Sequence, residues 1–509
     1  MNAATRKLSQ LSHELSSLVN SAPAKAIARA RASAILARSS LTDGQILKSG
    51  ILIDAGCRIR NEPAISEGCD ILRRLTAQAP DDHNLSYNLA NGLVAKADVS
   101  LVKRPDWYLS TADLRREARS LFHKAAIASQ SDDLKARAIT NLGNALRTAN
   151  RWVEAYDKYI EALKWDPTNG VAAMMAATVL LSCIDRGIGS DQILRSVAAK
   201  HLKSAKLNSE RLRELAGGQA IDRLEALMGS SSDAPVLPSG ALSEYERFVF
   251  ENRFQLSLTI EGFALSRETW DSLKIPPFTE RLVKGPNVPA IFAMFNVLKS
   301  DFLVARRLLF DAIYHPPKDT GSYYDTLDYA VYGTQFSMLT LAQRCCIDVL
   351  DKIANAVTEH LELGGTKQSV YFHNRWFALQ SASMKKRSWQ GRILKCVNSG
   401  NVAIIALAEI ALDIEKQGFL WEKKGSRNAG THRFVVLHDL GCQASRASAY
   451  VEHSGLEDFK QKTMESLRLA RAAIIYFVEL VALDERTRRK GVKAVPFVVL
   501  DHQAIRRRR

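Results

Sequence analysis

The chain has 509 residues and a formal net charge of +16. Hydrophobic residues make up 46% of it and charged residues 24%, a composition of folded globular domains that excludes a largely disordered chain. Its length exceeds what one hydrophobic core usually serves, so we expect two or three domains. The positive charge favours a polyanionic partner, and RNA, DNA and an acidic membrane surface would all satisfy it.

The sequence gives no sign of export or of a membrane span. Its first residues alternate polar and apolar at helical spacing, without the continuous apolar run of a secretion signal. No run of about 18 apolar residues occurs anywhere. The 7 cysteines are an odd number, scattered and without a CxxC pair, which indicates reduced thiols packed in cores instead of disulfides or a zinc site. We therefore expect a soluble, cytoplasmic protein without a metal or other cofactor.

The clearest internal repeat spans residues 138–170. Gly143 lies in a first helical stretch, Tyr159 lies between two alanines in a second, and Pro167 closes the unit. This pattern resembles the tetratricopeptide repeat (TPR), in which small residues let two helices cross closely while an aromatic side chain fills the groove between them. Weaker copies occur around Gly68 and around Gly92. The copy around Gly92 is interrupted by an insertion and continues at residues 118–125. Residues 45–228 are therefore predicted to form a TPR-like array, behind an N-terminal helical segment at 1–44. Such arrays commonly bind peptides or proteins, but these packing residues identify no ligand.

A segment rich in serine, proline and glycine interrupts the helical periodicity after the array, and we place a linker at residues 229–242. Apolar stripes at helical spacing then return over residues 346–361, 402–412 and 464–481. Only the segment VKAVPFVVL near the end has the pattern of an extended strand. The fold class is thus predicted to be all-α, with a helical bundle over residues 243–485 and a basic C-terminal tail at 486–509.

Between the second and third stripes lie Arg427, Asn428 and His432, in an Arg-Asn-x-x-x-His arrangement. Metal-independent RNA cleavage needs an acid or base that titrates near neutral pH and a fixed cation for the phosphate, which histidine and arginine supply. Five residues turn a regular helix by about 140°, so Arg427 and His432 converge only where the backbone is irregular or across a dimer interface.

Spacing alone does not single this pair out. Arg433 with His438 and Arg446 with His453 have similar spacing nearby. Arginine and histidine near helix ends often only cap carbonyl groups, so a purely structural role remains the alternative for each of these pairs.

The wider sequence resembles the HEPN superfamily, and specifically its large bacterial members with tetratricopeptide repeats in front. The resemblance covers roughly residues 243–485 and is carried by five segments in order: EYERFVFENRFQLSL, FNVLKSDFLVARRLLFDAI, DVLDKIANAVTEHLEL, VYFHNRWF and RNAGTHRF. It implies a bundle that forms a homodimer and places an Arg-x(4 to 6)-His motif of each protomer in a shared cleft. The family's catalytic pair carries over onto Arg427 and His432, with Asn428 as the polar residue after the arginine.

Arg433 with His438 and Arg446 with His453 do not lie where the family has its catalytic motif, so the resemblance ranks them as supporting or structural residues. The resemblance implies that a ribose 2′-hydroxyl attacks the adjacent phosphate and leaves a cyclic phosphate end. His432 would act as general base or acid, Arg427 would stabilise the phosphorane charge, and Asn428 would orient the phosphate. This chemistry requires no metal, in line with the lack of a carboxylate or Cys/His cluster in the sequence around the motif.

Basic and aromatic residues precede and adjoin the motif. They form either an RNA-binding surface, with tryptophans stacked on bases, or a solvated loop whose tryptophans pack inward. The candidate RNA-contacting residues are Lys385, Lys386, Arg387, Trp389, Trp421, Lys423, Lys424 and Arg433.

The leading hypothesis is a metal-independent endoribonuclease whose repeats bind a protein or peptide partner, of the kind found in toxin–antitoxin and antiphage defence systems. The defence role comes from the resemblance alone. The alternatives are a non-catalytic scaffold and a basic RNA-binding regulator. The presence of both Arg427 and His432 favours the enzyme, because two matched chemical roles are harder to explain by packing.

Overall fold

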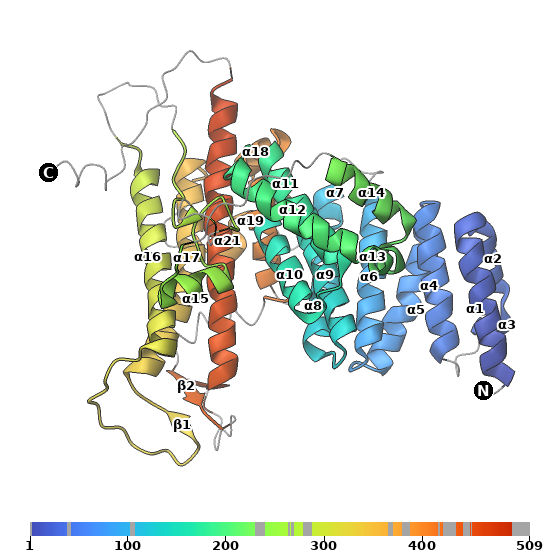
Figure 1. The fold of residues 1–509 in the computed structure, drawn as a ribbon, viewed down its shortest axis with the longest axis horizontal. Helices are drawn as coiled ribbons and strands as arrows, with labels where there is room; N and C mark the ends of the chain where they lie inside the picture. Colours follow the sequence, from blue (N-terminus) through green and yellow to red (C-terminus); the bar gives the residue numbers. More distant parts are fainter. Residues whose placement is uncertain are drawn as a thin grey trace.

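The computed structural model confirms the predicted all-α architecture, a helical array followed by a helical bundle, and adds one small sheet (Figure 1). The residues that the structure describes are 3–37, 42–101, 107–229, 240–262, 265, 269–277, 288–364, 370–378, 387–415, 418–420, 434–440, 448 and 450–490.

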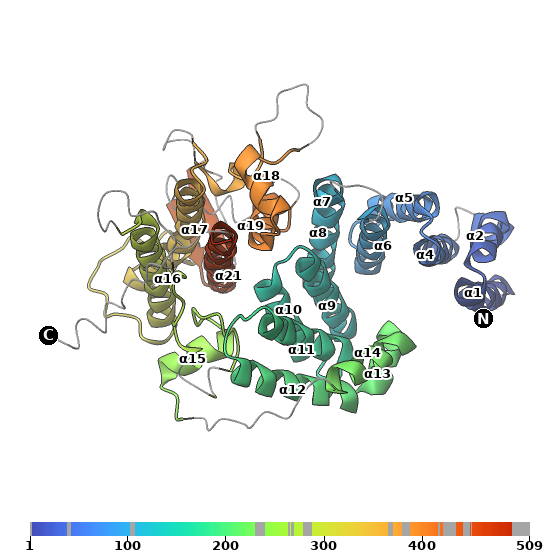
Figure 2. The same ribbon diagram turned by 90° about the horizontal axis from the view of Figure 1, so that it is seen from above.

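The N-terminal half is a row of helices that pack pairwise in chain order, α4 with α5, α6 with α8, α9 with α10 and α11 with α12 (Figure 2). We call α4 to α14 the repeat array. Its helices and those before it are α1 (Ala3–Ser21), α2 (Pro23–Ala32), α3 (Ala34–Ala37), α4 (Thr42–Arg58), α5 (Glu62–Gln78), α6 (His83–Leu101), α7 (Trp107–Ser110), α8 (Ala112–Ala128), α9 (Asp132–Thr148), α10 (Trp152–Trp165), α11 (Gly170–Asp185), α12 (Asp191–Leu207), α13 (Ser209–Ala216) and α14 (Gly218–Gly229).

Close helix crossings in the array depend on glycine, as the repeat pattern predicts. A Cβ atom on Gly143 of α9 would lie 2.7 Å from Cε1 of Tyr159 on α10, closer than real Cβ contacts come. The Tyr159 ring is buried there and its hydroxyl donates to Asn144 Oδ1 at 2.8 Å. Gly68 and Gly92 pack in the same way against Ile53 of α4. The small and aromatic residues of the repeat pattern therefore set the spacing of these helices, while the assignment of the repeats to the TPR family stays a prediction.

The C-terminal half is a bundle around one long central helix, α21, which packs against α16, α17 and α19. The three apolar stripes predicted from the sequence lie in α17, α19 and α21, and nearly all their side chains are buried. The helices after the array are α15 (Glu244–Asn252), α16 (Ala290–Tyr314), α17 (Thr334–His360), the short 3-10 helix η3 (Phe372–Asn374), α18 (Gly391–Asn398), α19 (Val402–Ile414) and α21 (Leu456–Arg488).

A three-stranded sheet that the sequence analysis did not predict lies at one end of the bundle (Figure 1). Its strands are β1 (Ala330–Val331), β2 (Phe434–His438) and β3 (Val451–Gly455), in the order β1-β2-β3. β1 pairs antiparallel with β2, and β2 pairs parallel with β3. The sequence FVVLH of β2 is rich in β-branched and aromatic residues, which suits a strand. The segment that we predicted to be extended, VKAVPFVVL, falls in residues 491–509, outside the described part of the chain.

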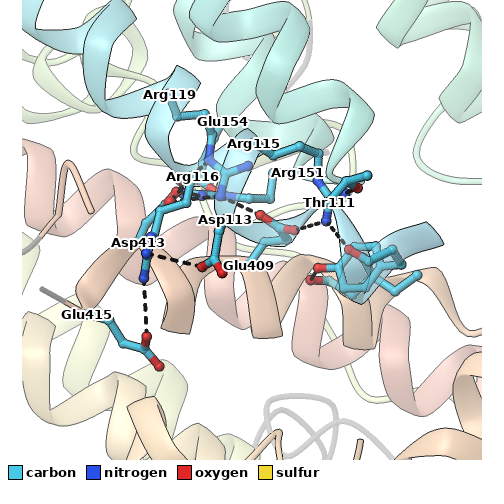
Figure 3. A network of polar contacts seen from close by, with 12 residues as sticks. Thr111, Asp113, Arg115, Arg116, Arg119, Arg151, Glu154, Glu409, Asp413 and Glu415 are labelled. Carbon is cyan, nitrogen blue, oxygen red and sulfur yellow. Dashed lines mark hydrogen bonds and ion pairs between the residues drawn. The ribbon is translucent and has the colours of Figure 1, made fainter. Parts of the chain in front are cut away.

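Buried ion pairs join the array to the bundle (Figure 3). Arg115 Nη2 of α8 donates to Glu409 Oε1 of α19 at 2.7 Å, and Arg119 binds Glu409 and Asp413 one turn apart on the same helix. Arg151, just before α10, also bonds to Asp413. The side chains of these five residues are at most 5% exposed. Because buried charges are costly unless they are paired, this arrangement strongly favours one placement of α19 against the array.

A second contact joins the array to α21. The Trp152 indole donates to Glu479 Oε2 at 2.8 Å, Arg186 pairs with the other oxygen of Glu479 at 2.8 Å, and the Val153 amide donates to the Tyr476 hydroxyl at 3.2 Å. Two helices of the bundle, α19 and α21, are thus fixed by side chains of the array.

The described cysteines are free thiols. Cys69, Cys183, Cys346 and Cys396 are buried as predicted, whereas Cys57 is exposed. In the part of the chain that the structure describes, no helix combines the length and apolar character needed to cross a membrane. The predicted linker at 229–242 falls largely in residues 230–239, which are not described.

Candidate active site

The predicted catalytic residues Arg427, Asn428 and His432 lie in residues 421–433, outside the described part of the chain. The described chain stops at residue 420 before the motif and resumes with β2 at Phe434, two residues after His432. The catalytic roles of the three residues stay predictions. Also outside the described residues are the RNA-contact candidates Lys385, Lys386, Trp421, Lys423, Lys424 and Arg433.

Two candidate RNA-contacting residues are described, and both have partners within the chain. Arg387 donates two hydrogen bonds to Glu415, at 2.9 and 2.7 Å. The half-buried Trp389 ring stacks with Tyr108 of α7 and with Phe377, each at 5.3 Å between ring centroids. These contacts accord with the alternative in which the tryptophan packs inward. An RNA contact by either residue stays a prediction.

The sheet brings together His438 and His453, which lie 15 residues apart in the sequence. The register pairs Val436 with His453 and His438 with Gly455, so the two histidines are diagonal neighbours on one face of the sheet. His438 is fully buried, while His453 is half-buried. Nε2 of His438 lies 2.8 Å from Nδ1 of His453, and Nδ1 of His438 lies 2.9 Å from the backbone oxygen of Asp328.

These contacts determine which ring nitrogen carries each proton. A backbone carbonyl oxygen only accepts hydrogen bonds, so Nδ1 of His438 carries the proton that it donates to Asp328. Nε2 of a neutral His438 then accepts, and Nδ1 of His453 must be the donor. In the neutral pair, Nε2 of His453 is therefore left with its lone pair, ready to take a proton. A histidine with its tautomer fixed in this way is suited to general acid–base chemistry.

An aspartate adds negative charge beside the pair. The Asp328 carboxylate accepts a hydrogen bond from Thr326 Oγ1 at 2.6 Å, and this bond, with smaller contributions from the Ala330 amide and His438, holds the pKa of Asp328 below its usual value. Asp328, His438 and His453 offer three donor atoms within 4.8 Å of one another. Two histidines and a carboxylate are a donor set that suits a divalent transition metal, provided that the His438 to His453 hydrogen bond opens.

Sequence reasoning did not find this cluster, because no short spacing indicates it. Asp328 lies 110 residues before His438, and the two histidines lie 15 residues apart on strands whose pairing is parallel.

Exposed aromatic side chains flank the three strands in the sequence, on the connection from α16 to β1, directly after β1, and at the starts of β2 and β3. The backbones of Phe434 and Tyr450 are adjacent, since Phe434 N donates to Tyr450 O at 2.8 Å. Tyr329 is tied to the residue after β2, because Asp439 N donates to Tyr329 O at 3.1 Å. Large exposed aromatics that gather in this way usually mark a binding surface. We call this set the aromatic rim: Tyr323, Tyr324, Tyr329, Tyr332, Phe434 and Tyr450.

A cleft of about 700 Å³ lies between the array and the bundle. Lysines from both sides line it, Lys124, Lys135 and Lys158 from the array and Lys462 from α21. Lys135 lies over the Trp165 ring, 3.9 Å from its centroid. Glu161 of the array and Asp458 and Glu465 of α21 also line the cleft, so its charges are mixed. The cleft joins the array to α21, the helix that directly follows β3 and His453.

Comparison with known protein families gives one match for the bundle. Residues 282–484 match the family described as LA2681-like HEPN, a stretch that runs from just before α16 to near the end of α21. The match does not extend to the array or to residues 243–281, which the sequence resemblance had included. A comparison with curated proteins finds no match. The bundle is thus similar to a HEPN domain, and because HEPN domains are generally ribonucleases, the match supports RNA cleavage.

Proposed function

We propose that this protein is a metal-independent endoribonuclease of the HEPN type. The observation that carries the proposal is the match of residues 282–484 to the LA2681-like HEPN family. The net charge of +16 suits a polyanionic substrate, and Arg427 and His432 supply the cation and the acid–base group that the reaction needs.

The proposed reaction uses the RNA's own 2′-hydroxyl as nucleophile. A base removes the 2′-proton, the 2′-oxygen bonds to phosphorus, and the bond from phosphorus to the 5′-oxygen breaks as that oxygen takes up a proton. The products are a 2′,3′-cyclic phosphate and a 5′-hydroxyl end. His432 serves as one proton-transfer group, Arg427 stabilises the charge on the pentacoordinate phosphate, and Asn428 orients it.

The repeat array is proposed to control this activity by binding a protein or peptide partner, in a cytoplasmic toxin–antitoxin or antiphage defence system. The support is structural. The array binds α19 and α21 through buried polar contacts, and the cleft between array and bundle reaches the start of α21 near β3. A partner seated in that cleft would touch both halves of the chain at once.

A homodimer through the bundle is part of the proposal. One Arg427 and one His432 make only half of a site that holds a phosphate between two cations and two acid–base groups, and a two-fold axis supplies the other half. Light scattering at micromolar concentration should give a dimer. A monomer with full nuclease activity would remove this part of the proposal.

The purified chain incubated with total RNA in excess chelator tests the function. We expect cleavage to persist with chelator and to fall by about 10² to 10⁴ in His432→Ala and in Arg427→Ala. Arg427→Lys should also fail, because lysine keeps the charge but not the planar fork. His13→Ala, an exposed histidine of α1, is the matched control and should cleave normally. Cleavage that chelator abolishes, or that both alanine variants retain, would contradict the proposal.

The rival function is a non-catalytic scaffold, or an RNA-binding regulator without nuclease activity. The buried junction between array and bundle would serve a scaffold equally well. Tight RNA binding without any cleavage by the wild-type chain would favour the regulator.

A further inference from the structure

We propose that Asp328, His438 and His453 bind one divalent transition-metal ion, such as zinc, and that this ion ties the connection from α16 to β1 to the strands β2 and β3. The site goes beyond the proposed ribonuclease function, whose chemistry needs no metal. Its ligand atoms are a carboxylate oxygen of Asp328, Nε2 of His438 and Nδ1 of His453, with water in the remaining positions.

His438 is oriented as a metal ligand. Its Nδ1–H donates to the Asp328 backbone oxygen at 2.9 Å, so Nε2 keeps its lone pair. Histidines that bind metals almost always donate the other ring N–H to a carbonyl or carboxylate oxygen, because this bond fixes the tautomer and the direction of the ring. The lone pair of His438 is thereby directed at Nδ1 of His453, 2.8 Å away.

The distance between the two ring nitrogens suits a shared ion. Two nitrogens bound to one ion at about 2.0 to 2.1 Å each lie about 2.8 to 3.4 Å apart, depending on the angle between the bonds. From 2.8 Å the rings therefore need to separate by about 0.6 Å at most. His453 is half-buried, so solvent can carry its proton from Nδ1 to Nε2, and the neutral ring then offers Nδ1 to the ion.

The backbone brings both the carbonyl and the carboxylate of Asp328 close to the histidines. Leu327 and Tyr329 on either side have φ of +57° and +60°, a left-handed conformation that is unfavourable for residues with a Cβ atom. Such strain persists only where the surrounding structure holds it, and it clusters at ligand sites. Thr326 Oγ1 and the Ala330 amide both donate to Oδ1, at 2.6 and 3.3 Å, so Oδ2 is the ligand atom.

The donor atoms select the class of ion. Imidazole nitrogens suit zinc, copper, nickel and cobalt, whereas magnesium and calcium prefer sites made of oxygen atoms. Three protein ligands leave positions open to water, unlike the closed four-ligand sites of structural zinc. When no ion is bound, the hydrogen bond between His438 and His453 closes the pair. RNA cleavage in excess chelator is therefore compatible with this site.

The ion controls the order of the aromatic rim. Asp328 lies near the end of the connection from α16 to β1, and Tyr323, Tyr324 and Tyr329 of the rim lie on the same connection. The two histidines lie on β2 and β3, so the ion links this connection to both strands, whereas β1 itself is only 2 residues long. Because metal binding stabilises the conformation that holds the ligands, the ion reduces the motion of the connection.

Metal binding is measured on the full-length chain without a purification tag, after removal of metal by chelator and dialysis. Co²⁺ is the probe, because its visible spectrum reports the number and kind of its ligands. We expect one Co²⁺ at this site, displaced by Zn²⁺ and not by excess Mg²⁺. His453→Ala and Asp328→Asn each remove a ligand and should weaken binding by at least about 100-fold, more than the loss of a partner outside the ligand set. His315→Ala, which removes an exposed histidine of the same bundle, should bind as the wild type does.

Nitrogen NMR of histidine-labelled wild-type protein identifies the ligand atoms directly. Without metal, the proton of His453 should be on Nδ1, where it bonds to His438. With one equivalent of Zn²⁺ the proton should be on Nε2, while His438 keeps its own proton on Nδ1. Two histidines that only hydrogen-bond to each other would keep both protons in place.

Limited proteolysis tests the effect on the connection. Chymotrypsin cleaves after aromatic residues, and Tyr324 is 93% exposed. Zn²⁺ should slow cleavage at Tyr324 several-fold in the wild type and in His315→Ala but not in His453→Ala. Equal cleavage rates with and without Zn²⁺ in wild-type protein that binds the ion would overturn the proposed ordering of the connection.

The outcomes separate this site from the proposed function, because none of these measurements uses RNA. A wild type that binds no Co²⁺, a site that Mg²⁺ occupies equally well, or a normally folded His453→Ala with full affinity would each overturn the inference. If His453→Ala does not fold, Asp328→Asn and the NMR titration of the wild type decide. A chain that binds the ion but cleaves no RNA would remove the ribonuclease and leave the metal site in place.

Discussion

Arg119 of the array meets Asp413 of the bundle through two hydrogen bonds, from Nε at 2.9 Å and from Nη2 at 2.8 Å. Both side chains have no exposure to solvent. The planar arginine fork matches the carboxylate in this geometry, and Asp413 also receives Arg151 from the start of α10. A single aspartate therefore holds two segments of the array against α19, and we expect array and bundle to lose structure together.

Asp413→Asn should destabilise the protein by about 3 to 5 kcal/mol, because it leaves Arg119 and Arg151 buried with too little negative charge. Urea denaturation followed by circular dichroism measures the change. Glu14→Gln is the matched control, since its partner Arg29 is 57% exposed and a surface pair contributes about 1 kcal/mol at most. An Asp413→Asn variant as stable as Glu14→Gln would show that the junction does not hold the two halves together.

Acid should weaken the same junction through Glu409. Burial alone would raise the pKa of this carboxyl, but the charges of Arg119 and Arg115 outweigh it and lower the pKa from 4.5 to about 2. A lowered pKa in the folded state means that Glu409 contributes stability above pH 4.5 and that this contribution is lost as the pH falls toward about 2. Urea midpoints measured across this range should drop less steeply in Glu409→Gln than in the wild type. If the urea midpoint of Glu409→Gln fell with pH as steeply as that of the wild type, the lowered pKa of Glu409 would not be the cause of the acid sensitivity.

Gly143→Ala should destabilise the array by about 1 to 3 kcal/mol, because the added methyl group meets the Tyr159 ring in a packed crossing. Gly50→Ala is the control. It also adds a methyl group to a helix of the array, but nothing beyond the local backbone of that helix lies within 4 Å of the new group, so it should be neutral or gain up to about 1 kcal/mol. If thermal melts ranked the two variants in the opposite order, glycine would not set this helix spacing.

Phe434→Ala and Tyr450→Ala should each weaken binding of single-stranded RNA by about 1 to 3 kcal/mol, the usual contribution of one stacked base. Fluorescence anisotropy with a 2′-O-methyl oligonucleotide, which cannot be cleaved, isolates binding from reaction. Leu207→Ala on the array, an exposed apolar residue far from the sheet in the sequence, should bind as the wild type does. Equal loss of affinity for duplex RNA would show that the rim does not stack on unpaired bases.

The sequence predicted the parts of the fold that depend on local periodicity. The stripes of α17, α19 and α21 and the crossing of Gly143 with Tyr159 follow from helical spacing and from residue size. The sequence also contains a charge pattern that predicts the junction between array and bundle. Arg115 and Arg119 lie four residues apart on α8, and Glu409 and Asp413 lie four residues apart on α19, so each pair occupies one helix face with opposite charge.

The candidate site was less predictable, because it depends on contacts between distant segments. The segment FVVLH directly follows the Arg-Asn-x-x-x-His arrangement in the sequence, and nothing local indicates that it pairs in parallel with residues 451–455. That pairing alone makes His438 and His453 neighbours. The roles of Arg427, Asn428 and His432 depend on the family resemblance, and the described chain reaches only the strand that follows them.

The most direct test of the central claim uses an RNA oligonucleotide with one 2′-deoxy nucleotide at a mapped cleavage position, in excess chelator. If the 2′-hydroxyl is the nucleophile, cleavage at that position stops while other positions are cut, and the products of the all-ribose substrate end in a 2′,3′-cyclic phosphate. Cleavage at the deoxy position, or products that end in a 3′-hydroxyl, would contradict metal-independent attack by the 2′-hydroxyl.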